Sequence, residues 1–209
     1  MKWNQILRRQ DYSLEEPDKT VTQFIKFLRK RRAKRVLDLG CGAGRHVVYL
    51  TKQGFETYGI DVSKTGLRKT RYRLRKEKLY ATLIQCDMET VPCIGRYFDA
   101  IISLFSIYHN TQQGIKDAIA ETHRTLRRGG TILLNFQSKR SGKYGKGTKI
   151  EEDTFLQEDG PERGITHHFV DEAEIRELLK RFKVLLLQLE EQEIRGYFQS
   201  RWVVLATKE

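Results

Sequence analysis

Segment 36–46, with the sequence VLDLGCGAGRH, contains three glycines in the spacing G-x-G-x-G. In many proteins a glycine-rich turn between a buried strand and a helix brings backbone amides close to a bound nucleotide. The dinucleotide-binding fingerprint requires G-x-G-x-x-G, but Arg45 stands at its third glycine position in this chain. The spacing therefore argues against a turn that holds a pyrophosphate, and the neighbouring residues must identify the ligand.

Three aspartates follow three successive predicted strands. Asp38 lies two residues before Gly40, where its carboxylate would repel a pyrophosphate and attract a cationic group. Asp61 ends the second strand, 21 residues after Gly40, a distance that suits hydrogen bonds to ribose hydroxyls. Asp87 ends the third strand, where it can accept a hydrogen bond from an adenine amino group while Met88 packs on the ring.

Together these positions describe an adenosyl ligand that carries an ammonium group and no phosphates, and S-adenosylmethionine fits that description. Each residue type also has an ordinary structural interpretation, since glycines often end strands and aspartates often begin helices or stabilise turns. The agreement of all three aspartates with predicted strand ends favours a ligand site over coincidence.

The elements that position these residues alternate between strand and helix. Strands are predicted at 35–39, 55–61, 80–87, 96–106 and 131–136. Helices are predicted at 18–31, 45–53, 63–78, 111–127 and 170–182, and the fourth is expected to end at RRGG with a glycine cap. This order is typical of an α/β protein with a doubly wound, mostly parallel sheet, closed here by an antiparallel pair at 183–192 and 197–208. One domain spanning 1–209 accounts for the chain.

Segment 137–169 has no clean periodicity, and irregular segments of this length in compact domains are usually functional or mobile. We expect it to be a substrate loop in which Lys143 and Tyr144 contact an anionic or aromatic substrate. An exposed flexible loop is the competing interpretation. One of His167 and His168, at the end of the segment, is expected to reach the pocket, and His168 is the candidate for substrate binding.

The amino-terminal segment 1–32 is the second region outside the alternating pattern. Its apolar residues fall on one face of a helix over 18–31, and Asp18 is a suitable N-cap. Trp3 and Tyr12 precede this helix. We expect the segment to form a helical lid beside the pocket.

The chain has 209 residues and a formal net charge of +12, and its cations are clustered. Segments 29–35, 68–78 and 139–149 carry six, seven and five Lys or Arg residues. Such clusters mark nucleic-acid sites, and they equally form the solvated surface of helices and loops, as in heat-stable proteins. Because no RNA-binding module accompanies them, a small-molecule partner is favoured over nucleic acid.

Cys41, Cys86 and Cys93 form no C-x-x-C pair, and their odd number argues against a disulfide framework. No apolar signal segment and no run long enough to span a bilayer is present. We therefore expect a reduced cytoplasmic protein, a monomer or homodimer, without membrane contact. The paired histidines 167 and 168 lack a third ligand at a suitable spacing, so no metal site is predicted.

The motifs VLDLGCGAGRH, YGID, CDME, FDAIISLFSIYH and HRTLRRGGTILLNF resemble successive motifs of class I S-adenosylmethionine-dependent methyltransferases. The resemblance covers about 30–136 closely, and HHFVDEAEIRELLKRF and the closing pair of strands also resemble the family. Within it, the chain is similar to small-molecule enzymes of the ubiquinone-biosynthesis and tellurite-resistance type. The usual L-x-P-G-G turn is LRRGG here, a departure that affects a distal turn.

The resemblance implies a Rossmann-like sheet of seven strands, mostly parallel, with the last strand antiparallel. It also implies cofactor-binding roles for a set of residues at the strand ends. The methionine part would lie beside Asp38, Gly40, Cys41 and Gly42, the ribose beside Asp61 and Val62, the adenine beside Asp87 and Met88, and the sulfonium beside Ser103 and Leu104.

Methyl transfer is an in-line displacement at the sulfonium methyl, so alignment of the nucleophile is the main task of the protein. A general base is needed only where the acceptor must lose a proton. Tyr108 and His109 are the candidates for catalysis and substrate binding, since a histidine side chain titrates near neutrality. A histidine that caps the following helix or bonds a backbone group is the structural alternative.

Three other functions compete with a small-molecule methyltransferase. An RNA or protein methyltransferase would use the basic patches, although the N-P-P-[YF] motif of amino methylation is absent and SLFSIY stands in its place. A binding protein would retain the cofactor without turnover. A nicotinamide dehydrogenase is disfavoured by Asp38 and Arg45.

Overall fold

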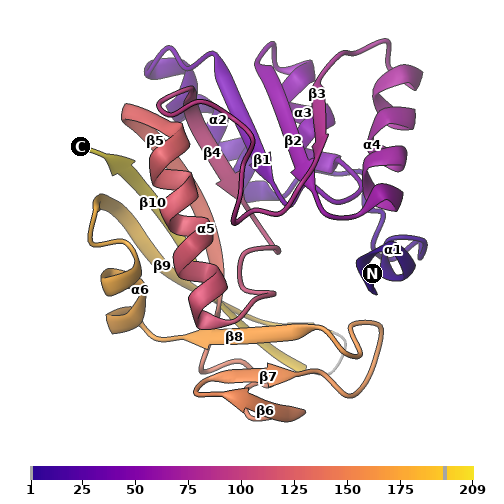
Figure 1. Ribbon diagram of the computed structural model, residues 1–209, viewed down its shortest axis with the longest axis vertical. Helices are drawn as coiled ribbons and strands as arrows, with labels where there is room; N and C mark the ends of the chain where they lie inside the picture. The colour runs from indigo at the N-terminus through magenta and orange to yellow at the C-terminus, as the bar shows by residue number, and fades with distance from the viewer. Residues whose placement is uncertain (1, 195–196) are drawn as a thin grey trace.

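The computed structural model describes residues 2–194 and 197–209 (Figure 1). The helices are α1 (Lys2–Ile6), α2 (Lys19–Lys30), α3 (Arg45–Lys52), α4 (Lys64–Lys76), α5 (Gln112–Thr125) and α6 (Glu172–Leu178). The strands are β1 (Arg35–Leu39), β2 (Glu56–Asp61), β3 (Thr82–Gln85), β4 (Phe98–Ser103), β5 (Leu126–Ser138), β6 (Thr148–Glu151), β7 (Thr154–Leu156), β8 (Thr166–Val170), β9 (Phe182–Ile194) and β10 (Tyr197–Lys208).

The main sheet has the strand order β3-β2-β1-β4-β5, with all neighbours parallel. β10 pairs with β5 in the antiparallel direction, and β9 pairs with the other edge of β10. These seven strands confirm the predicted Rossmann-like arrangement with an antiparallel last strand, and β8, β7 and β6 continue from β5 to make a sheet of ten described strands. The carboxyl ends of β1, β2 and β4 point toward one side of the molecule, where β8, β7 and β6 lie across them (Figure 1).

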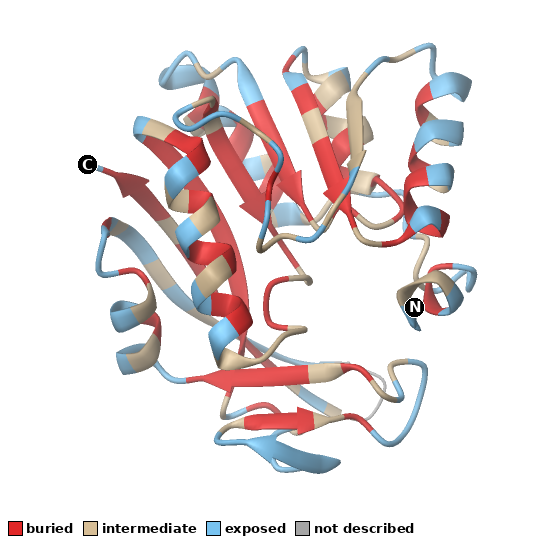
Figure 2. Ribbon diagram, viewed as in Figure 1, coloured by how far each residue is buried: buried red, intermediate tan, exposed pale blue. Residues whose placement is uncertain are grey.

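Helices cover both faces of the sheet. Successive residues of each central strand point to opposite faces, so the side chains on both faces are buried. In β4, Ile101 packs with α5 and α6, whereas Ile102 packs with α2 on the other face. Figure 2 shows the central strands buried along most of their length and the helices exposed along their outer faces. The alternation explains why the central strands read as continuous apolar runs in the sequence.

The helix caps follow the local sequence signals. Asp18 accepts a hydrogen bond from the Thr20 amide at the start of α2, and Asp171 accepts one from the Glu174 amide at the start of α6. α5 differs from the prediction, since it ends at Thr125 and Leu126 is already extended. The RRGG residues therefore enter β5 and do not cap a helix, so the predicted glycine cap was wrong.

Segment 137–169 is not one irregular loop, because it contains β6, β7 and β8. β7 pairs antiparallel with β6 and with β8, and β8 joins the carboxyl end of β5 through Gln137 and Phe169. All four residues of β6 are exposed, so this strand carries no alternation that a sequence pattern could reveal. No helix in the described ranges has the length and hydropathy needed to cross a bilayer.

Candidate functional site

The glycine turn between β1 and α3 is built from backbone that only glycine adopts readily. Gly40, Gly42 and Gly44 have φ values of 78°, 54° and 81°, in the left-handed region. The amides of Gly40 and Cys41 both donate to the carbonyl of Ile60, at 2.9 Å each, which fastens the turn to the end of β2. A Cβ atom at Gly40 would lie 2.5 Å from the Cβ of Ser106, so the turn also needs glycine for space.

Asp61 connects this turn to the start of α4. Its two carboxylate oxygens accept hydrogen bonds from the amides of Gly42 and Ser63, each at 2.7 Å. Each carboxylate oxygen can accept a second hydrogen bond, so the residue remains available to a ligand hydroxyl. Val62 and the residues that follow β3, Asp87 and Met88, line the same cavity.

Asp38 lies behind the glycine turn and is buried. Its Oδ2 atom has no hydrogen-bond partner among the described residues. Burial raises the pKa of Asp38 to about 7, with the Arg45 guanidinium opposing the shift and the Asp61 carboxylate adding to it. An unpaired buried carboxylate whose charged neighbours Arg45 and Asp61 line a cavity fits a ligand that brings a positive charge, as the sequence predicts for the ammonium of S-adenosylmethionine.

One cavity of about 790 Å³ opens at the carboxyl ends of the strands, within the size range of small-molecule sites. Its walls come from the amino-terminal segment, the glycine turn, the ends of β2, β3 and β4, and β9 and β10. The predicted site residues that line it are Gly40, Cys41, Gly42, Asp61, Val62, Asp87, Met88, Leu104, Tyr108, His109 and Lys143. Trp3 and Tyr12 of the amino-terminal segment line it too.

Asp38, predicted to border the cofactor, does not line the cavity, and neither does Ser103. Ser103 is fully buried, and its hydroxyl donates to the Leu39 carbonyl at 3.0 Å and lies 2.7 Å from the Ser106 hydroxyl. Ser106, three residues later, takes its place at the cavity wall. Ser103 is still part of β4, and its side chain packs beneath the glycine turn. For this reason Ser106, and not Ser103, reaches the cavity wall.

Tyr108 and His109 lie beyond the end of β4, in the turn that leads to α5. The His109 ring packs against Trp3 and His167, with ring centroids 4.8 and 4.7 Å apart. Burial lowers the pKa of His109 to about 3, so its imidazole is neutral. Burial raises the pKa of the Tyr108 hydroxyl, so that group stays protonated. Thr111 caps α5, which removes the capping interpretation of His109.

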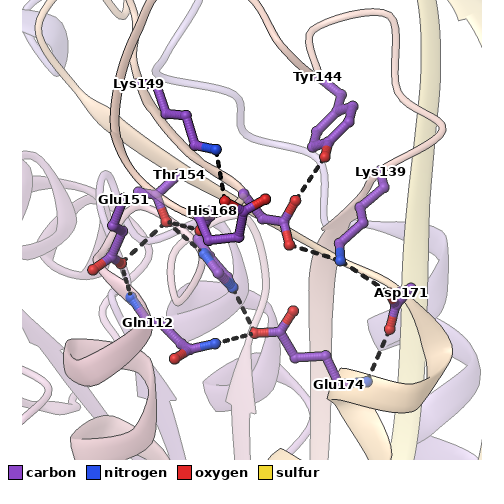
Figure 3. A network of polar contacts seen from close by, with 11 residues as sticks. Gln112, Lys139, Tyr144, Lys149, Glu151, Thr154, His168, Asp171 and Glu174 are labelled. Carbon is purple, nitrogen blue, oxygen red and sulfur yellow. Dashed lines mark hydrogen bonds and ion pairs between the residues drawn. The ribbon is translucent and has the colours of Figure 1, made fainter.

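Tyr144 and His168, predicted to bind substrate, belong to a polar network away from the cavity (Figure 3). The Tyr144 hydroxyl donates to Asp153 at 2.6 Å, and its ring packs edge-on against Phe155 and Phe169. Neither side chain lines the cavity in this structure, because both are engaged in contacts with β7, β8 and the residues beside them.

His168 is fully buried, and both of its ring nitrogens have partners. Nδ1 lies 2.7 Å from the Thr154 hydroxyl and Nε2 lies 2.8 Å from Glu174 (Figure 3). Gln112 donates to the same Glu174 oxygen at 3.0 Å, which joins α5, β7, β8 and α6. The residue therefore supports the small sheet.

We predict that His168→Ala lowers the free energy of unfolding by about 2–4 kcal/mol, because it opens a cavity and leaves two buried polar partners unpaired. Cofactor affinity should stay unchanged. Urea unfolding and calorimetric cofactor titration measure the two quantities. Tyr144→Phe, on the exposed side of the same network, is the control and should lose about 1 kcal/mol or less. A stable His168→Ala protein that no longer binds an acceptor would contradict this assignment.

Several residues that line the site had no signal in the sequence. Glu162 lies 3.0 Å from the Lys143 ammonium and 3.2 Å from Nε2 of His167. Arg201 of β10 and Arg45 both stack on the ring of Phe105. These groups come together only through strand pairing, such as the hydrogen bond from the His168 amide to the Tyr108 carbonyl at 2.9 Å.

Comparison with known proteins agrees with this geometry. Residues 36–130 match the family model described as a methyltransferase domain. An N,N-dimethyltransferase of Streptomyces venezuelae that acts on dTDP-3-amino-3,4,6-trideoxy-alpha-D-glucopyranose is 33% identical over 129 residues, which are 61% of this chain and 51% of that protein. A glycine/sarcosine N-methyltransferase of Aphanothece halophytica is 28% identical over 137 residues, which are 64% of this chain and 50% of that protein.

The chain spans about half the length of these curated relatives. The crystal structure of an S-adenosylmethionine-dependent methyltransferase from Methanosarcina mazei has a TM-score of 0.76 and 24% identity to this chain, and the match covers 92% of this chain and 98% of that one. That likeness extends the shared fold well beyond the matched domain. The domain match and the relatives show that 36–130 is similar to methyltransferase domains, and the structural likeness shows that the chain has the fold of the Methanosarcina mazei protein.

Proposed function

We propose that this protein transfers a methyl group from S-adenosylmethionine to a nucleophilic atom of a small molecule. The observation that carries the proposal is a single cavity that joins the glycine turn and its aspartates to a polar chamber around Tyr108 and His109. S-adenosylmethionine supplies the activated methyl group when it is bound. The residues of the chain bind, orient and enclose the two reactants.

The donor half of the cavity has one group for each part of the cofactor. Asp38 pairs with the ammonium group, and its unpaired buried oxygen is the support for that role. Asp61 accepts hydrogen bonds from the ribose beside Val62, while Asp87 and Met88 take the adenine. The glycine turn keeps the wall free of side chains at Gly40 and Gly42.

The acceptor half offers one donor and one unpaired acceptor. The protonated Tyr108 hydroxyl can donate to the substrate. Nδ1 of the neutral His109 ring is buried without a partner in the described part of the chain, so it can bind a polar atom of the substrate. Lys143 also lines this half, 3.0 Å from Glu162. Alignment of the nucleophile by such contacts is the main contribution a protein can make to this displacement.

The charges of segment 139–149 favour a small molecule over RNA. Lys139, Arg140, Lys143 and Lys149 each have a carboxylate within 2.6–3.1 Å. A cation that is already paired releases fewer counterions on binding phosphate and so contributes less to nucleic-acid affinity. We infer a cytoplasmic enzyme whose three free cysteines remain reduced.

The direct test is a panel of amine, hydroxyl and thiol acceptors with S-adenosylhomocysteine formation as the readout. In parallel, Asp61→Ala should weaken cofactor binding by about 1–3 kcal/mol, or roughly 5- to 150-fold, as measured by calorimetry. Asp117→Ala, on the outer face of α5, is the matched control. Unchanged affinity in the Asp61 variant, or methylation of tRNA but of no small acceptor, would reject the proposal.

A further inference from the structure

We propose that His109, Glu162 and His167 form a binding site for one divalent transition-metal ion beside the acceptor half of the cavity. One ligand atom from each of the three side chains lies within 4.8 Å of the other two. The three residues come from the turn after β4, the β7–β8 connection and β8. Metal binding is a property of these side chains and goes beyond the proposed transfer reaction.

Unpaired imidazole nitrogens point to a ligand at this place. His167 is fully buried; its Nδ1 has no hydrogen-bond partner within the described ranges, and its Nε2 has the Glu162 carboxylate at 3.2 Å. Nδ1 of His109 is also buried and unpartnered there. Buried polar groups are nearly always satisfied, and each unsatisfied group costs about 1–3 kcal/mol. A single cation at the centre of the cluster would be a partner for Nδ1 of His109 and for one ring nitrogen of His167.

The outer contacts are those of a metal-binding histidine. The backbone of Thr166 accepts a hydrogen bond from the His109 ring, and Nδ1 is the nitrogen left without a partner. Histidines that bind metals usually donate their second ring N–H to a carbonyl or carboxylate, which fixes the tautomer and directs the free lone pair at the ion. His109 therefore presents a lone pair in a fixed direction, and with an ion bound this lone pair contacts the metal and not a substrate atom.

Glu162 supplies the negative charge of the site. Its Oε2 atom lies 3.2 Å from Nε2 of His167 and 3.0 Å from the Lys143 ammonium. The Lys143 ammonium beside it favours the ionised carboxylate. In the described structure Lys143 is the cation nearest to this carboxylate, and metal binding requires Glu162 to turn from Lys143 toward the two rings.

The donor set selects the class of ion. Two imidazoles and one carboxylate suit Zn²⁺, Fe²⁺ or Co²⁺, whereas Mg²⁺ and Ca²⁺ prefer oxygen ligands. Ligand atoms about 2.0–2.1 Å from a tetrahedral ion are roughly 3.3 Å apart, so the side chains must close slightly from the observed spacing. Three protein ligands leave a fourth position open, and His109 and Glu162 both face the cavity. If the proposed function holds, that position receives the nucleophilic atom of the acceptor.

The test begins with the full chain stripped of metal by a chelator and titrated with Zn²⁺ and with Co²⁺. We expect one ion per chain and the visible absorption bands of four-coordinate Co²⁺. Glu162→Gln and His167→Ala should each weaken Zn²⁺ binding by at least about 100-fold, since outer contacts alone are worth about 10- to 100-fold. His123→Gln, a histidine on α5 outside the cluster, should bind as the unaltered chain does.

Cofactor titration of the same proteins separates the two proposals. Variants that bind S-adenosylmethionine normally and have lost only the metal support the site and show that they are folded. If the unaltered chain binds Zn²⁺ no better than His167→Ala, or if bound Co²⁺ keeps its six-coordinate spectrum, the metal site is rejected and Lys143 is the only cation of the cluster. Intact metal binding without cofactor binding would instead reject the proposed function.

Discussion

Asp38→Asn should stabilise the cofactor-free protein at pH 8 and weaken its affinity for S-adenosylmethionine. The stability effect follows from the burial that raises the pKa of Asp38 from 3.8 to about 7. Between these two values the native state retains a proton that the unfolded state has lost, so native stability falls as the pH rises. Asparagine does not ionise, and it resembles the protonated acid in size and shape.

The pKa shift of Asp38 sets an upper limit on this change in the free energy of unfolding. At about 1.4 kcal/mol for each pKa unit, the ionised carboxylate lowers stability at pH 8 by at most roughly 4 kcal/mol. We expect a gain of about 1–3 kcal/mol for the variant at pH 8 and little change at pH 4. Cofactor affinity should fall by about 1–3 kcal/mol, because the ammonium group loses its charged partner.

Urea unfolding at pH 4 and pH 8 measures the first effect, and calorimetric titration of the cofactor at pH 8 measures the second. Asp117→Asn, a half-buried position on α5 that does not line the cavity, is the control for the general loss of one negative charge. A variant that is equally destabilised at both pH values would show that Asp38 is ionised throughout. Unchanged cofactor affinity would remove Asp38 from the ammonium site.

Gly40→Ala should abolish measurable cofactor binding and lower the stability of the fold. The φ value of 78° is strained for any residue with a Cβ atom, at about 1–2 kcal/mol. The added methyl would also lie 2.5 Å from the Cβ of Ser106 and 2.8 Å from its hydroxyl, so the turn must move away from Ser106. That movement displaces the amides held by Ile60 and Asp61.

Gly54→Ala separates the effect of backbone strain from the effect of the contact with Ser106. Gly54 ends α3 with a φ value of 86°, and a Cβ atom there would have no neighbour within 4 Å. It should therefore lose about 1–2 kcal/mol of stability from backbone strain alone and bind the cofactor normally. Equal losses of stability in the two variants, with cofactor affinity retained in both, would show that the turn tolerates the contact with Ser106.

The parts of the fold that were predictable are those whose signals are local. The glycine turn, the caps at Asp18 and Asp171 and the apolar central strands are each encoded within a few neighbouring residues. Their order along the chain then determines the parallel sheet, because right-handed crossovers allow few alternatives. The donor half of the site follows directly, since its residues stand at strand ends.

The acceptor half was less predictable because it depends on strand register. Neighbouring residues in a strand point to opposite sides, so only one of His167 and His168 can point toward His109 and Glu162. Which one does so is decided by the pairing of β8 with β7 and β5, and no local pattern contains that pairing. Glu162 reaches His167 through the same arrangement, in a segment with no periodicity.

The insertion of β10 between β5 and β9 has a consequence for the order of folding. β10 is the last described strand to leave the ribosome, and its partners in β5, such as Gln137 opposite Arg201, are synthesised much earlier. Tyr197, Gln199 and Arg201 of β10 form part of the acceptor wall. Because contacts between distant segments form late, we expect the donor half to assemble first on the nascent chain. If the proposed function holds, a growing chain would bind the cofactor before it can bind a substrate, and methyl transfer would begin only after β10 has been synthesised.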